Sequence, residues 1–96
     1  MPGKGVIRFN MFTGIVETTS RVMRTLNGSG LKAITIELPK SFNDLKKGSS
    51  IACDGICLTV TQLNTDSFNV EIMQETVQKT TAGNWNKGTI LNLERA

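Results

Sequence analysis

Three chemically capable side chains stand at every second position between residues 56 and 61: Cys57, Thr59 and Thr61. Side chains alternate between the two faces of a β-strand, so the thiol and the two hydroxyls share one face and the apolar side chains between them share the other. A thiolate is a nucleophile, and a hydroxyl both donates and accepts hydrogen bonds. The polar face therefore predicts a surface where a polar ligand docks. The alternative is that threonine simply suits a strand and that Cys57 packs as a small apolar residue.

The composition excludes several classes of site. The chain has no histidine, which leaves no imidazole base, no Ser-His-Asp triad and no histidine-ligated metal within it. Cys53 and Cys57 are four positions apart, which is not the Cys-x-x-Cys spacing of zinc and redox sites. The net charge of +3 comes from 11 basic and 8 acidic residues scattered along the chain. A nucleic-acid binder would show a basic stripe with interleaved aromatic residues, so nucleic acid is not an expected partner.

The length and the apolar content predict one small globular domain. A chain of 96 residues buries about two thirds of its unfolded surface when it folds. No apolar run approaches the length of a membrane span, and residues 1–10 have no signal-peptide core. Two unbridged thiols in a small domain suit a reducing compartment, so we expect a cytoplasmic protein without a membrane partner.

Turn signals divide the chain into six short strands. The strongest is Asp54-Gly55, which lies between two apolar runs and predicts a two-residue hairpin turn. That turn places Cys57 opposite Ala52 and points its sulfur and that of Cys53 to opposite faces, a poor geometry for a disulfide. The predicted strands are residues 13–26, 31–38, 50–53, 56–63, 67–73 and 89–93.

Short strands separated by turns, with little helix, predict an all-β fold, either an antiparallel barrel or a sandwich. Two short helices accompany the strands in this interpretation. Residues 41–47 form a helical turn that holds Phe42 and Leu45 against a barrel end. Residues 75–82 form a short helix that Gly83 caps.

Four segments carry a family resemblance. Residues 54–61, Asp-Gly-Ile-Cys-Leu-Thr-Val-Thr, resemble the Asn-Gly-x-Cys-Leu-Thr-Val motif of the riboflavin synthase family, in its lumazine-binding repeat. Residues 11–17, Met-Phe-Thr-Gly-Ile-Val-Glu, are similar to the start of the family's sequences. Residues 73–76, Met-Gln-Glu-Thr, and residues 91–96, Leu-Asn-Leu-Glu-Arg-Ala, are similar to two later segments in the same order. Four motifs in register are far more specific than any one alone.

The resemblance covers residues 11–96 and implies a six-stranded antiparallel Greek-key barrel. Residues 1–10 are interpreted as a leader or extension, because family members typically begin at the position of Met11. The family carries two such barrels in each chain, and this sequence corresponds to the N-terminal one. One departure is mild: Asp54 replaces the usual asparagine, and both residues tolerate the turn conformation.

The resemblance implies a role in riboflavin biosynthesis. The family's enzyme is a transferase that dismutates two molecules of 6,7-dimethyl-8-ribityllumazine to riboflavin and 5-amino-6-ribitylamino-pyrimidinedione, without a cofactor or a metal. The two substrates lie between the N-terminal barrel of one subunit of a homotrimer and the C-terminal barrel of another. One barrel alone therefore implies a half-site that binds lumazine and riboflavin with little or no turnover. For an isolated barrel we expect a homodimer, because the surface that would meet the second barrel is exposed.

Two residues of the polar strand face correspond to the family's pocket. Cys57 matches the family cysteine, and its thiol could assist addition to the lumazine or proton transfer if its pKa is lowered. The alternative for Cys57 is a buried apolar side chain. Thr59 lies on the same face, and its hydroxyl suits the carbonyl and N–H edge of a pyrimidinedione. The alternative for Thr59 is an ordinary strand threonine.

Further residues are implied at the rim of this pocket. Glu75 and Thr76 match the family's Glu-Thr pair, and Glu75 would accept hydrogen bonds from ribityl hydroxyls; alternatively it is a charge in the first turn of a helix. Met73 would lie flat against the ring system, or it fills the core. Gly14 and Ile15 would offer backbone amides and an apolar wall, or they pack as a plain strand.

Two other functions stay open. The first is a non-catalytic flavin or lumazine carrier on the same barrel, as in lumazine antenna proteins. A carrier has no need of a thiol beside a reactive ligand, so Cys57 favours the enzyme lineage. The second is a generic β-barrel interaction module, which no particular residue pattern indicates.

Overall fold

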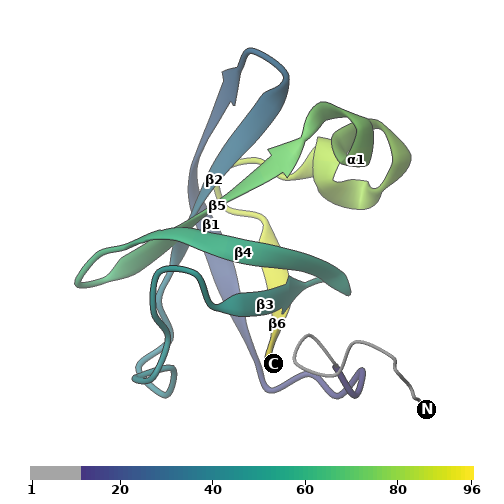
Figure 1. Cartoon of the computed structure of the whole chain (residues 1–96). Coiled ribbons are helices and arrows are strands. Elements are labelled where there is room, and N and C mark those ends of the chain that lie inside the picture. The colour runs from purple at the N-terminus through teal and green to yellow at the C-terminus, as the bar shows by residue number, and fades with distance from the viewer. Residues whose placement is uncertain (1–11) are drawn as a thin grey trace.

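A computed structural model describes residues 12–96, and the leader predicted at residues 1–10 lies outside the described residues, as does Met11. The described chain forms a closed antiparallel barrel of six strands, in the order β1-β2-β5-β4-β3-β6 around the barrel (Figure 1). The order is a Greek key, because β5 returns between β2 and β4 and β6 closes the barrel between β1 and β3. The predicted fold class is confirmed. The strands are Thr18–Gly28 (β1), Leu31–Glu37 (β2), Ser50–Cys53 (β3), Ile56–Leu63 (β4), Ser67–Met73 (β5) and Ile90–Arg95 (β6).

The hairpin between β3 and β4 has the predicted turn and register. Asp54 and Gly55 have φ angles of +49° and +81°, so both central residues lie in the left-handed region that a two-residue hairpin turn requires. Cys57 pairs with Ala52 as predicted. Asp54 also fixes the turn to β6, because its N–H donates to the Asn92 carbonyl at 2.8 Å and its Oδ1 accepts from the Asn92 N–H at 2.7 Å.

The core follows the period-2 pattern of the strands. Apolar side chains at alternate positions point inward, and two aromatic side chains from outside the strands, Phe42 and Trp85, join them. The buried apolar residues are Val22, Ile34, Ile36, Phe42, Leu45, Ile51, Cys53, Leu58, Val60, Phe68, Val70, Ile72, Ala82, Trp85, Leu91 and Leu93. The residues between them face outward, so the polar faces of β4 and β5 form the outer surface of the barrel.

The first strand begins later than predicted. The sequence places a strand from Thr13, whereas β1 starts at Thr18 and continues to Gly28. The reason lies in the preceding segment: Gly14 has a φ of +83°, which turns the chain out of a strand conformation. The amides of Thr13 and Gly14 donate to the Glu94 carboxylate instead of to a neighbouring strand.

One of the two predicted short helices is present, and it is shorter than predicted. Residues 41–47 make turns rather than a helical turn, because so short a segment between two strands does not pay for helix nucleation. Phe42 and Leu45 are nevertheless buried, as predicted. The second helix, α1, covers Gln74–Lys79, and Gly83 does not cap it. Gly83 lies instead inside a following 3-10 helix, η1, which covers Thr81–Asn84.

Candidate ligand-binding site

Cys57 and Thr59 lie on the outer face of β4. Both side chains are exposed, whereas Leu58 and Val60 between and beyond them are buried, which confirms the predicted division of the strand into two faces. The alternative in which Cys57 packs as a buried apolar residue is therefore wrong. No hydrogen bond of the Thr59 side chain to another of residues 12–96 is found. A thiol and a hydroxyl are thus presented together to solvent.

The two cysteines differ in accessibility and in acidity. Cys53 is buried, and burial, with smaller contributions from Asp54 and Cys57, raises the pKa of its thiol to about 12. A thiol with so high a pKa carries almost no thiolate at neutral pH. Of the two, Cys57 is therefore the thiol that a ligand or a reagent in solution can reach.

The pairing between β4 and β5 stops short of these residues. The last pair of the ladder at this end joins Val60 to Val70, although β4 begins at Ile56 and β5 continues to Met73. Figure 1 shows the two strands diverging toward α1. The outer faces of residues 56–59 and 71–73 therefore flank a seam in the barrel where the strands are not paired with each other.

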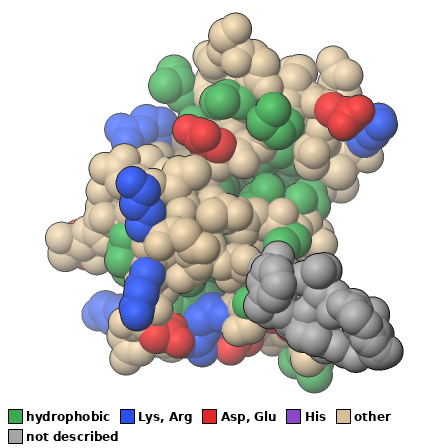
Figure 2. Space-filling view, viewed as in Figure 1, with side chains coloured by type: hydrophobic (Ala, Val, Ile, Leu, Met, Phe, Trp, Pro, Cys, Tyr) green, Lys and Arg blue, Asp and Glu red, His purple; other side chains and the backbone are tan. Residues whose placement is uncertain are grey.

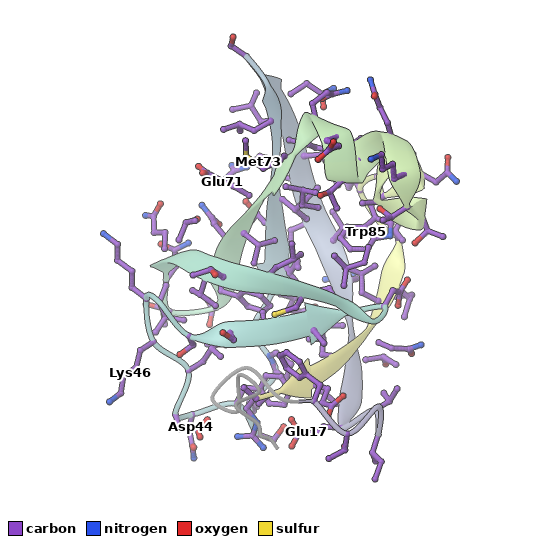
Figure 3. The ribbon with its side chains drawn as sticks, turned by 45° about the vertical axis from the view of Figure 1, so that its right-hand side comes forward. Glu17, Asp44, Lys46, Glu71, Met73 and Trp85 are labelled. Atoms are coloured by element: carbon purple, nitrogen blue, oxygen red, sulfur yellow. The ribbon has the colours of Figure 1, made fainter. Side chains whose placement is uncertain are left out.

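Met73 and Glu71 form the β5 side of this seam. Figure 3 shows their side chains on the same side of β5, opposite to the side where Trp85 lies. Met73 is 65% exposed, so the alternative in which it fills the core is wrong. Glu71 is absent from the residues predicted for the site. The alternation of residues along β5 could have identified it, because this alternation places Glu71 on the same face as Met73.

The helix α1 brings Glu75 and Thr76 to the end of β5. The Gln74 N–H donates to the Gly30 carbonyl at 3.0 Å, which fixes the start of the helix to the β1–β2 hairpin. Glu75 stands in the first turn and forms an exposed ion pair with Lys79 at 3.4 Å. Thr76 is half-buried. The position of Glu75 thus agrees with the alternative interpretation, in which it is a charge in the first turn of a helix. Its contact with a ligand stays a prediction.

The segment that contains Gly14 and Ile15 reaches the site from the other side. The Glu94 carboxylate accepts from the Thr13 N–H at 2.7 Å, the Thr13 hydroxyl at 2.8 Å and the Gly14 N–H at 3.1 Å. Glu94 pairs with Ala52, and Ala52 pairs with Cys57, so the three side chains form one row across the outer face. Adjacent strands lie about 4.8 Å apart, so Glu94 lies about 10 Å from Cys57.

This anchoring changes what the segment offers to a ligand. The Gly14 amide donates to Glu94, and the Ile15 amide donates to the Thr13 hydroxyl at 3.2 Å. The side chain of Ile15 is 70% exposed. The two amides are therefore already used, and the Ile15 side chain is the group that remains available to a ligand. Its contact with a ligand stays a prediction.

Most of the predicted residues stand exposed on the outer surface of the barrel. A broad hollow of about 1080 Å³ lies elsewhere on the barrel, beside the Arg21–Glu37 ion pair and residues 38–43, and none of the predicted site residues lines it. Hydrophobic side chains gather in the indentation between the part of the molecule that carries α1 and the part that carries β3 and β4 (Figure 2). An open, indented surface of this kind suits a flat heterocycle.

Metal and membrane features are not found in the part of the chain that the structure describes. Residues 12–96 contain no group of three or more histidine, cysteine, aspartate or glutamate side chains that could hold a metal ion. No helix within the same residues is long and apolar enough to cross a membrane.

Comparison with known proteins identifies the family. The family model of the lumazine binding domain matches residues 13–96. Riboflavin synthase of Bacillus subtilis (strain 168) is 43% identical over 86 residues, which are 90% of this chain and 40% of that protein. The chain thus spans about 40% of the length of that curated relative.

Solved structures agree on the fold. LumP complexed with riboflavin superposes with a TM-score of 0.89 at 16% identity, over 95% of this chain and 50% of that chain. LumP complexed with 6,7-dimethyl-8-(1'-D-ribityl) lumazine gives a TM-score of 0.87 at 17% identity, over 95% of this chain and 52% of that chain. The fold and the family match together place the chain in the lumazine binding domain family.

Proposed function

We propose that this barrel is the N-terminal domain of a riboflavin synthase and binds 6,7-dimethyl-8-ribityllumazine and riboflavin along the β4–β5 seam. The observation that carries the proposal is the exposed pair of Cys57 and Thr59 at the place where the ladder between the two strands ends. The names of the curated relatives support the activity, and the ligands of the LumP structures support the ligand class.

Each side chain of the seam has a role in this proposal. The Thr59 hydroxyl pairs with the carbonyl and N–H edge of the pyrimidinedione. The Met73 thioether lies against the ring system, and Glu75 and Thr76 receive the ribityl hydroxyls. The Cys57 thiol stands close enough to take part in addition or proton transfer. The seam provides the orientation of one heterocycle, and a second barrel would provide that of the other.

The complete reaction needs two lumazines held face to face, so one barrel supplies half of the site. General acid–base groups each contribute about 10²–10⁴-fold to a rate, and the groups of the second barrel are not in this sequence. We therefore propose that the separate chain binds ligand with little or no turnover. A reducing, cytoplasmic location belongs to the same proposal.

An apolar patch beside the seam supports self-association. Leu26 pairs with Ala33 across β1 and β2, and Leu31 pairs with Met73 across β2 and β5, all on the outer face. Exposed apolar patches tend to be covered by a partner, and a two-fold dimer is the commonest closed assembly. We propose a homodimer, and light scattering should give twice the chain mass for the wild type and the chain mass for Leu26→Glu.

Titration with riboflavin tests the ligand proposal. A ligand of roughly 27 heavy atoms at about 0.3 kcal/mol each reaches ~8 kcal/mol, which is a dissociation constant near 1 μM. Binding should quench the fluorescence of riboflavin in that range. Absence of a saturable change up to about 1 mM would reject the site.

A non-catalytic carrier is the second candidate, because LumP shares this fold and its solved structures hold 6,7-dimethyl-8-(1'-D-ribityl) lumazine and riboflavin. The two candidates differ at Cys57. In the longer protein to which the enzyme proposal assigns this barrel, Cys57→Ser should lower riboflavin formation while riboflavin binding persists. A carrier would form no riboflavin with either residue at this position.

A further inference from the structure

Lys32 is a buried lysine on the inner face of β2. Its side chain is only 5% exposed, and it pairs with Ile72 of β5 on one side and with Asn27 of β1 on the other. Lysine is almost never fully buried unless its charge has partners, because moving an ammonium group out of water is costly. The barrel must therefore supply those partners.

Both partners are backbone carbonyls that follow α1. Lys32 Nζ donates to the Ala82 carbonyl at 3.0 Å and to the Trp85 carbonyl at 2.8 Å. The Ala82 carbonyl also accepts from the Trp85 N–H at 3.2 Å, so Lys32 is its second donor. The Trp85 carbonyl lies beyond the end of η1, where no helical N–H follows to pair with it, and the ammonium group satisfies it. Ala82 and Trp85 are themselves buried, with 0% and 2% exposure, which shields the contact from water and salt.

The helix α1 is held at both of its ends, and along its length the partly buried Val77 packs against the core. None of its residues is buried. Its start is fixed by the hydrogen bond from Gln74 to Gly30, and the chain after it is fixed by Lys32, so two nearby residues of the β1–β2 region hold both ends. A Cβ atom at Gly83 would lie 3.1 Å from the Val77 carbonyl oxygen, so the missing side chain lets η1 approach α1 closely.

We infer that Lys32 is a positioning residue for the ligand site, which keeps Glu75 and Thr76 at the end of the β4–β5 seam by fixing the chain that returns from α1. The inference rests on the proposed ligand binding. An apolar side chain of similar volume would fill the same space, although it would leave the buried Trp85 carbonyl without its Lys32 donor. What an apolar side chain cannot replace is the direction imposed by two hydrogen bonds.

The test compares Lys32→Met and Lys32→Arg with the wild type. Three quantities are measured: the riboflavin dissociation constant, the urea unfolding transition, and the emission of Trp85, which is the one tryptophan of the chain. Lys32→Met should unfold cooperatively, bind riboflavin at least about ten-fold more weakly, which is about 1.4 kcal/mol, and shift the Trp85 emission to the red. Lys32→Arg keeps a cation with several donors and should recover most of the affinity.

The outcomes separate this inference from the function on which it rests. Absence of riboflavin binding by the wild type would reject the proposed function and the inference with it. Binding by the wild type with equal affinity in a folded Lys32→Met protein would overturn the inference alone. Weaker binding with an unchanged Trp85 emission would also overturn it, because the segment would not have moved. If Lys32→Met does not fold, Lys32→Gln takes its place, and the same two results decide.

Discussion

Thr59 and Thr61 share the outer face of β4 but have different surroundings, and replacing each by valine separates binding from stability. The Thr61 hydroxyl donates to the Asn69 carbonyl at 3.2 Å, and Thr61 is half-buried. The Thr59 side chain is exposed and forms no such bond among the described residues. The two substitutions remove the same chemical group and keep nearly the same shape, so each serves as the control for the other.

Thr59→Val should weaken riboflavin binding without destabilising the barrel. Polar atoms of the ligand would be left without a partner in the contact, at a cost of about 1–3 kcal/mol, which is about a 5- to 150-fold rise in the dissociation constant. The free protein loses nothing from its interior, so its free energy of unfolding should stay within about 0.5 kcal/mol of the wild type. Fluorescence titration and urea unfolding measure the two quantities on the same samples.

Thr61→Val should show the reverse. Its lost hydrogen bond should lower the free energy of unfolding by about 0.5–1.5 kcal/mol, because the Asn69 carbonyl loses a partner. Riboflavin affinity should change little, since the Thr61 hydroxyl is already used within the barrel. If both substitutions weaken binding equally, or if Thr59→Val leaves it unchanged, the ligand does not lie where the seam places it.

Three further results are expected. Glu94→Gln should lower the free energy of unfolding by about 1–3 kcal/mol in urea melts, because a carboxamide cannot accept all three hydrogen bonds of the threonine–glycine turn. The hydrogen bonds from Arg95 hold the pKa of Glu17 below its ordinary value of 4.5. The stability from Glu17 is therefore present above pH 4.5 and lost as the pH falls through its lowered pKa, so the urea midpoints of wild type and Glu17→Gln should converge in acid. A thiol reagent should modify Cys57 rapidly and Cys53 only on unfolding; two fast thiols in the folded protein would contradict the burial of Cys53.

The strands that could be predicted from sequence are those fixed by local chemistry. The Asp54-Gly55 turn alone sets the register of the hairpin, and the residues of β3, β4 and β5 match the predicted ranges. Alternation along β4 likewise predicted which side chains are exposed. The outer position of Cys57 and Thr59 was available from sequence for this reason, because in a half-buried strand the face of a residue follows from its parity.

What could not be predicted depends on residues distant in the chain. The late start of β1 results from Glu94, which is about 80 residues away from the turn it binds. Residues 41–47 were predicted to form a helical turn that holds Phe42 and Leu45 against a barrel end, but turns bury the same two side chains. Lys32 falls on the apolar face of β2 by parity, yet a lone lysine there carries no sign of the two carbonyls that it binds.

The β4–β5 seam lies at the same end of the barrel that Trp85 and Lys32 close from inside. β4 begins and β5 ends at the same end of the barrel, since the two strands are antiparallel, and the chain continues from β5 directly into α1 and then to Trp85. Figure 3 shows Trp85 next to α1 at that end. A ladder that continued past Val60 and Val70 would engage Cys57 and Thr59 in pairing with β5. Because pairing stops there, Cys57 and Thr59 have no β5 partner beside them, while Trp85 and Lys32 complete the interior at this end. The surface that we assign to the ligand thus depends on how the core is closed, so substitutions inside the barrel end should change ligand affinity without touching the ligand.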